Sequence, residues 1–205
     1  MMRFKGLSIL GLAALALTLV GCAKTYPPMP AELDQAFEPW YLIGPGDSVN
    51  IVVWRNPELS GPVIVRPDGK ITTALVEDIP ATGRTPTQLA REIEKALAKY
   101  IQSPVVTVIV GGFLGPYTEQ IRVIGEAAKP QALAYRENMS LLDVMIIVGG
   151  ITDFAAGNKA SIRRIVGGKT EQFGVRLIDL VRRGDLSANV AMRPGDILII
   201  PQSFF

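Results

Sequence analysis

The residue types that commonly carry out acid–base or metal chemistry are few in this chain, and they are scattered along it. The 205 residues include no histidine, which removes the commonest general base and metal ligand. The carboxylates Glu77, Asp78, Glu126 and Asp153 show no pairing in the sequence, and no glycine-rich phosphate loop of the Walker or dinucleotide type occurs. We therefore expect no catalytic residue, no metal site and no cofactor. The residues that bind a ligand stay unknown at this point.

Two further aspartates lie in a repeated Pro-Gly-Asp motif, directly before β-branched or apolar runs. They are Asp47, after Pro45-Gly46, and Asp196, after Pro194-Gly195. Both could act as ligands or acids. A structural role is favoured, because proline and glycine set the dihedral angles of a turn and the aspartate carboxylate accepts backbone N–H bonds there.

The single cysteine, Cys22, is the side chain for which the sequence predicts a covalent modification. A positively charged start with Arg3 and Lys5 precedes an apolar run of signal-peptide length, too short to span a bilayer comfortably. The sequence Leu19-Val20-Gly21-Cys22 resembles a bacterial lipobox, in which the cysteine becomes the lipidated first residue. We therefore expect residues 1–21 to be a signal peptide. The alternative is a cysteine that merely lies in a signal or anchor helix.

The segment after the cysteine, residues 22–39, is rich in proline and has no clear period, so we interpret it as an extended tether. Ala23 follows the cysteine in place of an aspartate. By resemblance to lipoprotein sorting rules, this implies anchoring in the outer membrane, with the protein facing the periplasm. Without residues 1–21, Lys+Arg falls from 21 to 19 against 19 Asp+Glu, so the mature chain is neutral. Bulk charge gives no reason to expect nucleic acid as a partner.

Residues 40–113 are predicted to form a first domain with a mixed sheet. An alternating, β-branched run from Ser48 to Trp54 is typical of a strand. Val63–Val65 and Ile71–Thr73 flank an Asp-Gly turn, and we expect them to pair as a hairpin. Val105–Val110 is apolar on both faces, so we expect a central strand.

The clearest helix signal in the chain begins at Thr85. This residue suits the N-cap, Pro86 suits the first helical position, and Gln88 completes a capping box. One face of the expected helix is apolar and should pack on the sheet. Its residues are Leu89, Ile93, Ala96, Leu97 and Tyr100.

Residues 118–205 are predicted to form a second domain. Ser140 and Asp143 form a pattern that caps a helix, and the segment Leu141–Val148 that follows is apolar nearly all round. We therefore expect the whole helix, including Ile146, to be buried, and to end at the glycine pair after it. The expected strands are residues 121–123, 160–166, 170–176 and 197–200.

Both blocks resemble domains of bacterial polysaccharide export proteins. The first resembles the family's polysaccharide export sequence domain, and the second its SLBB module, the soluble-ligand-binding β-grasp domain. The first resemblance rests on Y-L-I-G-P-G-D, Ile51–Trp54, R-P-D-G-K-I and Ser103-Pro104-Val105-Val106-Thr107-Val108; the second rests on V-I-G-E, K-P, S-L-L-D-V and V-G-G-I-T. The implied fold class is α+β, with two small domains: residues 40–113 as a mixed-sheet export domain with one amphipathic helix, and residues 118–205 as a β-grasp domain. Gln131 stands where the family usually has glycine after Lys-Pro, so this loop is expected to close differently.

By resemblance, the protein is a periplasmic, outer-membrane-anchored component of a conduit that exports exopolysaccharide or capsule. The implied partners are the polysaccharide, further copies of the chain in a homo-oligomeric ring, and an inner-membrane polysaccharide copolymerase. The sequence stops at Gln202-Ser203-Phe204-Phe205, where family members that perforate the membrane themselves carry an amphipathic helix. We therefore expect a separate outer-membrane porin to complete the path.

Two other functional classes stay open. A soluble sugar- or ligand-binding β-grasp lipoprotein would form no conduit, and an enzyme would trim the polymer. Self-association in solution separates the conduit component from the binding module. Loss of activity on changing one carboxylate, with assembly intact, would favour the enzyme. The sequence determines neither the polymer nor the number of subunits in a ring.

Overall fold

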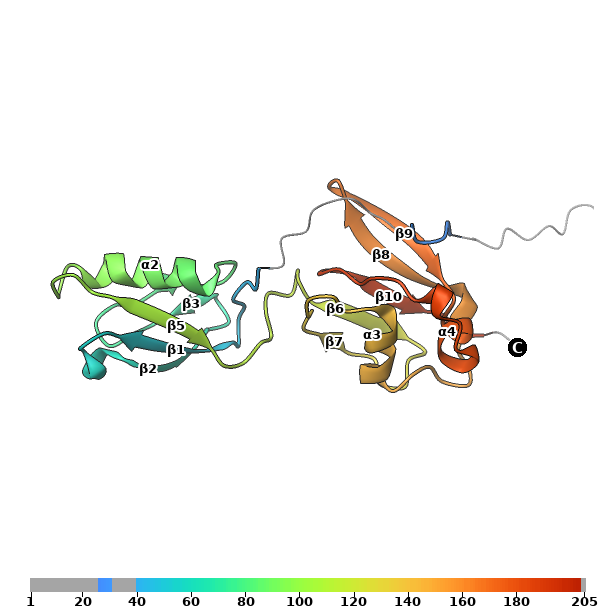
Figure 1. The fold of residues 1–205 in the computed structure, drawn as a ribbon, viewed down its shortest axis with the longest axis horizontal. Coiled ribbons are helices and arrows are strands. Elements are labelled where there is room, and N and C mark those ends of the chain that lie inside the picture. The colour runs from blue at the N-terminus through green and yellow to red at the C-terminus, as the bar shows by residue number, and fades with distance from the viewer. Residues whose placement is uncertain (1–25, 31–39, 204–205) are drawn as a thin grey trace, which may run out of the picture.

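Two small α+β bodies follow one another along the chain, and each encloses its own hydrophobic core (Figure 1). The computed structural model describes residues 26–30 and 40–203. The expected signal peptide (1–21), the lipidation site Cys22 and the terminal Phe204-Phe205 pair lie outside the described residues. The predicted fold class, α+β with two small domains, is confirmed.

The first domain is built on a three-stranded antiparallel sheet. β1 (Ser48–Val53) lies in the centre, between β2 (Gly61–Ile64) and β5 (Val106–Val110). One face of this sheet is covered by α2 (Pro86–Leu97), as Figure 1 shows. The expectation of a central position for β5 is wrong. β5 is an edge strand, and its outward-facing Ile109 is 52% exposed.

A separate two-stranded ladder joins β3 (Lys70–Ile71) to β4 (Ile79–Pro80). The predicted Asp-Gly turn forms, and the Arg66 N–H donates to the Lys70 carbonyl at 2.9 Å. The strands on either side of this turn nevertheless belong to different sheets, so the predicted hairpin is wrong. β2 pairs with β1, whereas β3 pairs with β4.

The helix α2 begins and packs as its sequence predicts. The Thr85 side chain accepts from the Gln88 N–H at 3.2 Å, and the Gln88 side chain accepts from the Thr85 N–H at 3.0 Å, which is a complete capping box. Leu89, Ile93 and Leu97 are buried against the sheet. Tyr100 lies beyond the helix end and is 60% exposed, so its predicted place on the buried face is wrong.

The second domain has a five-stranded sheet with the strand order β7-β6-β10-β8-β9. The two central strands, β6 and β10, run parallel, and every other neighbouring pair runs antiparallel. This order, with the first and last strands parallel at the centre, is the β-grasp arrangement. The strands are β6 (Ile121–Gly125), β7 (Ala132–Leu133), β8 (Ala160–Val166), β9 (Lys169–Val175) and β10 (Ile197–Ile200).

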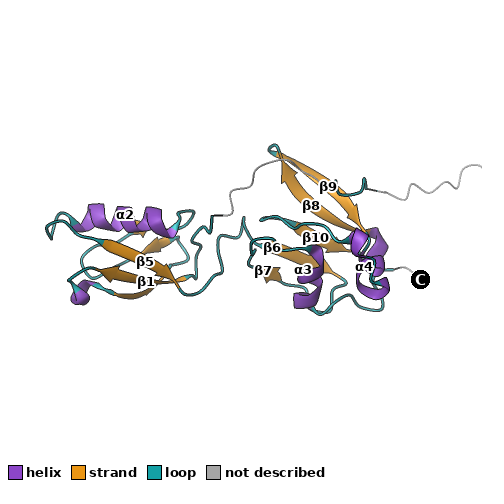
Figure 2. Cartoon of the chain, viewed as in Figure 1, coloured by secondary structure: helices purple, strands orange, loops and turns teal. Residues whose placement is uncertain are grey.

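Two α-helices connect the strands of this sheet, α3 (Leu141–Val148) after β7 and α4 (Leu177–Arg183) after β9. Both are seen beside the sheet in Figure 2. The predicted hairpin between residues 160–166 and 170–176 is confirmed, with β9 beginning one residue earlier. Within the described residues, the short 3-10 helices are η2 (Pro57–Leu59), η3 (Gly157–Lys159) and η4 (Leu186–Ala188).

The loop between β6 and β7 closes without the glycine that the family usually has. Gln131 is not among the residues with positive φ, and its carbonyl accepts the Val123 N–H at 2.9 Å. A side chain at this position is therefore compatible with the turn.

The helix α3 is buried on one side, which corrects the prediction that it is buried all round. The capping box of Ser140 and Asp143 is present, and Gly149 ends the helix with φ of 78°. Four of its side chains lie in the second core: Leu141, Val144, Met145 and Val148. Ile146 is 69% exposed, because a helix packed on a single sheet buries one face however apolar the other face is.

Part of the predicted tether lies against the second domain. Pro28 forms a parallel bridge with Gly174 of β9, and the Gly174 N–H donates to the Pro27 carbonyl at 2.7 Å. Met29 packs against the second core. Within the described residues 26–30, the segment is therefore docked on an edge strand rather than free.

Val144→Asp and Ile146→Asp test the assignment of the buried face of α3. Val144 is 0% exposed, so Val144→Asp places an unpaired carboxylate in the core and should lower the free energy of unfolding by at least about 3 kcal/mol. Ile146→Asp, on the same helix, should change it by no more than about 1 kcal/mol. Thermal and urea unfolding measure both values. Equal losses would contradict the observed orientation of the helix.

Candidate functional site

A buried carboxylate holds the connection between the two domains. Asp47 is 0% exposed and belongs to the turn before β1. Its Oδ2 accepts the Gly44 N–H at 2.8 Å and the Tyr41 hydroxyl, and its Oδ1 accepts the N–H groups of Leu114 at 2.8 Å and Gly115 at 3.1 Å. These charge-assisted hydrogen bonds compensate the burial of the charge. The first domain thereby fixes the segment that leads into the second.

Tyr41 reinforces this connection. Its hydroxyl donates to Asp47 and accepts the Gly115 N–H at 3.1 Å, and its ring meets Phe113 edge-on, with 5.3 Å between ring centroids. Burial, and then the hydrogen bond and negative charge of Asp47, raise the pKa of Tyr41 well above its usual range. The hydroxyl therefore remains a proton donor to Asp47 at physiological pH.

The connecting segment is also held from the side of the second domain. The Gln120 Nε2 group donates to the carbonyls of Leu114 at 3.1 Å and Gly115 at 3.4 Å. Gly44 packs so closely on Gly115 that a Cβ at Gly44 would lie 2.0 Å from the Gly115 carbonyl carbon. Glycine is required at position 44 because any side chain would force this contact apart.

The second Pro-Gly-Asp turn is fixed by a buried ion pair. Asp196, 0% exposed, accepts from Arg164 at 2.8 Å and 2.6 Å, and also accepts the Arg193 N–H at 2.8 Å. The Arg164 Nη2 group also donates to the Ala191 carbonyl at 2.8 Å. A bidentate pair of this kind is specific in geometry, and its partners depend on each other because either charge alone would be costly to bury.

The two Pro-Gly-Asp turns frame the connection between the domains. A Cβ on Gly46 would lie 2.9 Å from Leu114 Cδ1, and one on Gly195 would lie 2.6 Å from the Thr118 carbonyl oxygen. Both glycines have positive φ, 89° and 80°. Asp47 and Asp196 are occupied by internal hydrogen bonds, so the structural interpretation of the repeated motif fits and a ligand or acid role does not.

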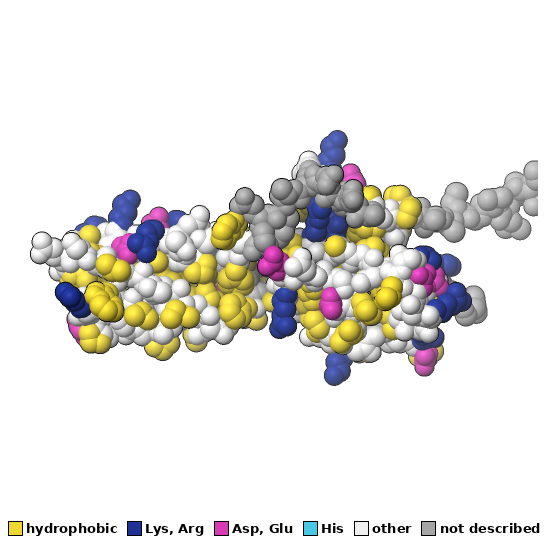
Figure 3. Space-filling view, in the orientation of Figure 1, with side chains coloured by type: hydrophobic (Ala, Val, Ile, Leu, Met, Phe, Trp, Pro, Cys, Tyr) yellow, Lys and Arg dark blue, Asp and Glu magenta, His cyan; other side chains and the backbone are white. Residues whose placement is uncertain are grey.

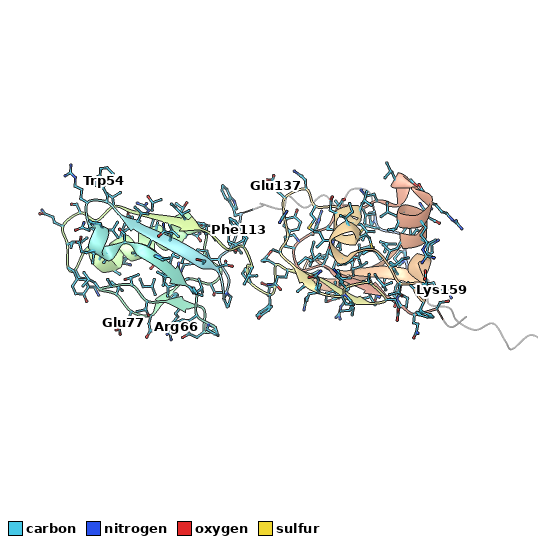
Figure 4. All side chains as sticks on the ribbon, turned by 90° about the horizontal axis from the view of Figure 1, so that it is seen from below. Trp54, Arg66, Glu77, Phe113, Glu137 and Lys159 are labelled. Carbon is cyan, nitrogen blue, oxygen red and sulfur yellow. The ribbon has the colours of Figure 1, made fainter. Side chains whose placement is uncertain are left out.

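A groove of about 180 Å³ lies at this junction, and we call it the junction groove. Both domains and the connecting segment contribute to it. Its aromatic and carboxylate residues come from segments far apart in the sequence, and Figure 4 shows Phe113 and Glu137 at the facing ends of the two domains. The lining residues are Trp40, Tyr41, Leu42, Leu114, Gly115, Glu119, Ala134, Tyr135, Glu137 and Pro194.

Comparison with known proteins identifies the family. Residues 35–111 match the family described as Polysaccharide biosynthesis/export protein. The chain is 30% identical over 182 residues to the EPS I polysaccharide export outer membrane protein EpsA of Ralstonia solanacearum, a match that covers 77% of this chain and 47% of the relative. The protein of the same name from Ralstonia nicotianae is 28% identical over 186 residues, covering 79% and 47%. Residues 35–111 therefore belong to the polysaccharide biosynthesis/export family.

A more distant relative is the Exopolysaccharide production protein ExoF of Rhizobium meliloti. It is 25% identical over 177 residues, which cover 79% of this chain and 40% of ExoF. The chain thus spans about half the length of the curated relatives it matches, or less. Among the helices of the described residues 26–30 and 40–203, none is long and apolar enough to cross a membrane.

The carboxylates that the sequence singled out do not meet in the structure. Asp78 pairs with Arg66 at 2.6 Å, Asp153 pairs with Arg182 at 3.0 Å, and Glu126 accepts the Thr152 hydroxyl. Glu77 is exposed. In the described part of the chain, no three acidic or cysteine side chains are grouped as they would be around a metal ion. Cys22 lies outside the described residues.

The residues of the junction groove were not found from the sequence. Trp40 and Glu119 lie at the ends of the predicted domains, and Tyr135 and Glu137 lie in the loop between β7 and α3. The available signal was the concentration of aromatic residues at the boundary between the domains, at Trp40-Tyr41, Phe113 and Tyr117. These aromatic residues do not predict which residues of the second domain line the other side of the groove, because that depends on how the two domains pack against each other.

Asp47→Asn tests the role of the buried carboxylate. The amide replaces one acceptor oxygen by a donor, which leaves buried N–H groups unsatisfied, so the free energy of unfolding should fall by about 2–3 kcal/mol. Asp68→Asn is the control. Asp68 has a side chain 44% exposed and forms a surface pair with Arg66, so its loss should cost less than about 1 kcal/mol.

A second measurement separates this role from a general loss of stability. Amide hydrogen exchange at Leu114 and Gly115 should accelerate in Asp47→Ala more than exchange in β8, because Leu114 then loses its acceptor and Gly115 keeps only the Tyr41 hydroxyl. Unchanged exchange at these two amides would show that Asp47 does not hold the connecting segment.

Proposed function

We propose that this protein is a periplasmic component of a polysaccharide export conduit, anchored by lipid at Cys22 to the outer membrane. The observation that carries the proposal is the family match over residues 35–111, together with curated relatives whose names state polysaccharide export and outer membrane. The anchor rests on the resemblance of residues 19–22 to a lipobox. The proposed role is non-catalytic, because Asp78, Glu126 and Asp153 take part in structural contacts and Glu77 lies exposed.

Within this function we propose that the two domains have the identities that the resemblance implies. Residues 40–113 are the polysaccharide export domain, and residues 118–205 are an SLBB module. The strand order of the second sheet, with β6 and β10 parallel at its centre, supports a β-grasp module. Residues 1–21 are the signal peptide, and residues 22–39 connect the anchor to the first domain.

We further propose that copies of the chain assemble into a homo-oligomeric ring that is coupled to an inner-membrane copolymerase. An uncovered apolar surface on the first domain supports self-association. Figure 3 shows hydrophobic side chains across the visible face of this domain, and Trp54 projects from it on the side away from the second domain (Figure 4). The surface opposite α2, which we call the outer sheet face, consists of Asn50, Val52, Trp54, Pro62, Ile64, Val105, Thr107 and Ile109, all exposed.

The composition of the outer sheet face suits contact between identical chains. None of its eight side chains is charged, so a neighbouring copy can cover this face without removing a charge from water. Isolated exposed apolar residues are ordinary, but a contiguous apolar face over one sheet is typical of an interaction site.

A second candidate is a ligand-binding lipoprotein that forms no conduit. The junction groove favours it, because three aromatic rings and two carboxylates lie together there. Oligomeric state distinguishes the two candidates. A protein that remains monomeric at micromolar concentration favours the binding module, and a defined oligomer favours the conduit component.

Ile64→Glu tests the proposed assembly surface. Ile64 is 67% exposed, and a charge there should raise the dissociation constant between copies at least about tenfold, because the contact would bury an unpaired carboxylate. Ile165→Glu, at an isoleucine 71% exposed on the second domain, is the matched control and should assemble as the wild type does. Sedimentation velocity measures both. Assembly of the Ile64→Glu variant at wild-type concentration would exclude this face.

Cys22→Ser in a deletion strain of the source bacterium tests export and anchoring together. Deletion of the gene should stop secretion of the polymer, and the wild-type gene should restore it. The serine variant should fold and leave the membrane fraction, because a lipidated terminus binds firmly and no helix in the described residues can insert in its place.

The readouts of this experiment are secreted polymer and fractionation after a high-salt wash. Ala23→Ser, which keeps the cysteine, serves as the matched control. Undiminished secretion in the deletion strain would refute the export function. A serine variant that stays in the outer-membrane fraction would refute the lipid anchor.

A further inference from the structure

We propose that the junction groove binds a single unit of an uncharged saccharide chain. The proposal deepens the export function and rests on it for the class of ligand. The side chains that line the groove supply the chemistry for recognising a sugar.

The first argument is the aromatic surface. Trp40, Tyr41 and Tyr135 all line the groove, and Trp40 is 67% exposed. A pyranose ring presents a patch of C–H groups on one or both faces, and such a patch packs on an aromatic ring. Tyrosine and tryptophan suit this contact because each combines a large apolar body with a polar handle that hydrogen-bonds to a hydroxyl or to water.

The second argument is the charge of the lining. Glu119 and Glu137 are carboxylates, which only accept hydrogen bonds, whereas each sugar hydroxyl can donate one. Arg193 lies close enough to Tyr135 to influence its hydroxyl, but the side chains that line the groove include two acidic residues and no basic one. A uronate or sulfated sugar would meet like charge there.

The third argument is that both walls are fixed in advance. Leu114 and Gly115 are held by Asp47, and Pro194 lies in the turn closed by Asp196. A wall that is already ordered loses little conformational entropy when a ligand binds. The groove is thus built by the same two turns that join the domains.

The size of the groove limits what it can hold. Its volume of about 180 Å³ is below the ~300–1,000 Å³ of pockets that enclose drug-sized ligands. One sugar unit fits, and the rest of the chain remains in solvent. Weak binding of single units suits a transport path, because a transported species must bind well enough to enter and weakly enough to leave.

The test uses purified full-length lipidated protein in a detergent without a sugar headgroup. Saturation-transfer difference NMR and titration measure the binding of cellopentaose and maltopentaose as neutral probes, pentagalacturonic acid as an anionic probe and chitosan pentamer as a cationic probe. At least one neutral probe should bind with a dissociation constant of about 1 mM or weaker, and tighter than the anionic probe at low salt.

Tyr135→Ala should weaken binding of the neutral probe about tenfold, because the ring is a main contact surface. Tyr100→Ala is the matched control, since Tyr100 is 60% exposed on the first domain and does not line the groove. Binding in this control should remain as in the wild type. Glu137→Gln should weaken the neutral probe several-fold and relieve the discrimination against the anionic probe.

Three results would overturn the proposal. The first is that neither neutral probe binds at concentrations up to about 10 mM. The second is that the wild type and Tyr135→Ala bind the neutral probe equally. The third is that chitosan pentamer binds at least about tenfold tighter than both neutral probes, which would indicate a cation site formed by the aromatic rings and carboxylates. Failure of this proposal is distinguishable from failure of the export function. A groove without saccharide affinity in a protein that restores secretion refutes the groove alone, and saccharide binding by a protein whose deletion leaves secretion intact refutes the export function alone.

Discussion

The burial of the Asp47 carboxylate is the constraint on which the arrangement of this molecule depends. A charge removed from water is costly unless hydrogen bonds replace its solvation, and here the replacement comes from three backbone N–H groups and the Tyr41 hydroxyl. Two of those N–H groups belong to the segment between the domains. The same interaction therefore stabilises the first turn of the export domain and sets the direction in which the chain leaves it.

The second domain contacts the connecting segment through a similar turn, which is also fixed by a buried aspartate. Its last strand, β10, is preceded by a Pro-Gly-Asp turn that the Arg164–Asp196 pair fixes, and the glycine of that turn lies directly on Thr118. Each turn uses glycine because the backbone has positive φ and because neighbouring atoms leave no space for a side chain. The junction groove exists because two rigid turns approach one short segment without filling the space between them.

The placement of apolar surface connects this architecture with the proposed role in export. The first domain covers one face of its sheet with α2 and leaves the other face exposed. The β-grasp sheet packs against its helices, and the segment Pro27–Met29 docks on its edge strand β9. An uncovered apolar face on one domain and a polar–aromatic groove at the junction are different kinds of surface. They suit different partners, another copy of the chain for the first and a sugar unit for the second.

Local signals in the sequence determined most of the elements, because capping boxes, glycine stops and alternation act within a few residues. Thr85 with Gln88, Ser140 with Asp143, and the structural role of both Pro-Gly-Asp aspartates could all be predicted in this way. The side on which an apolar element is buried could not. Ile146 and Ile109 are exposed although their neighbours in sequence are apolar, since only one layer packs on each of these elements. The pairing of β2 with β1 and the groove around Tyr135 were likewise decided by tertiary structure, because both depend on which distant segments meet.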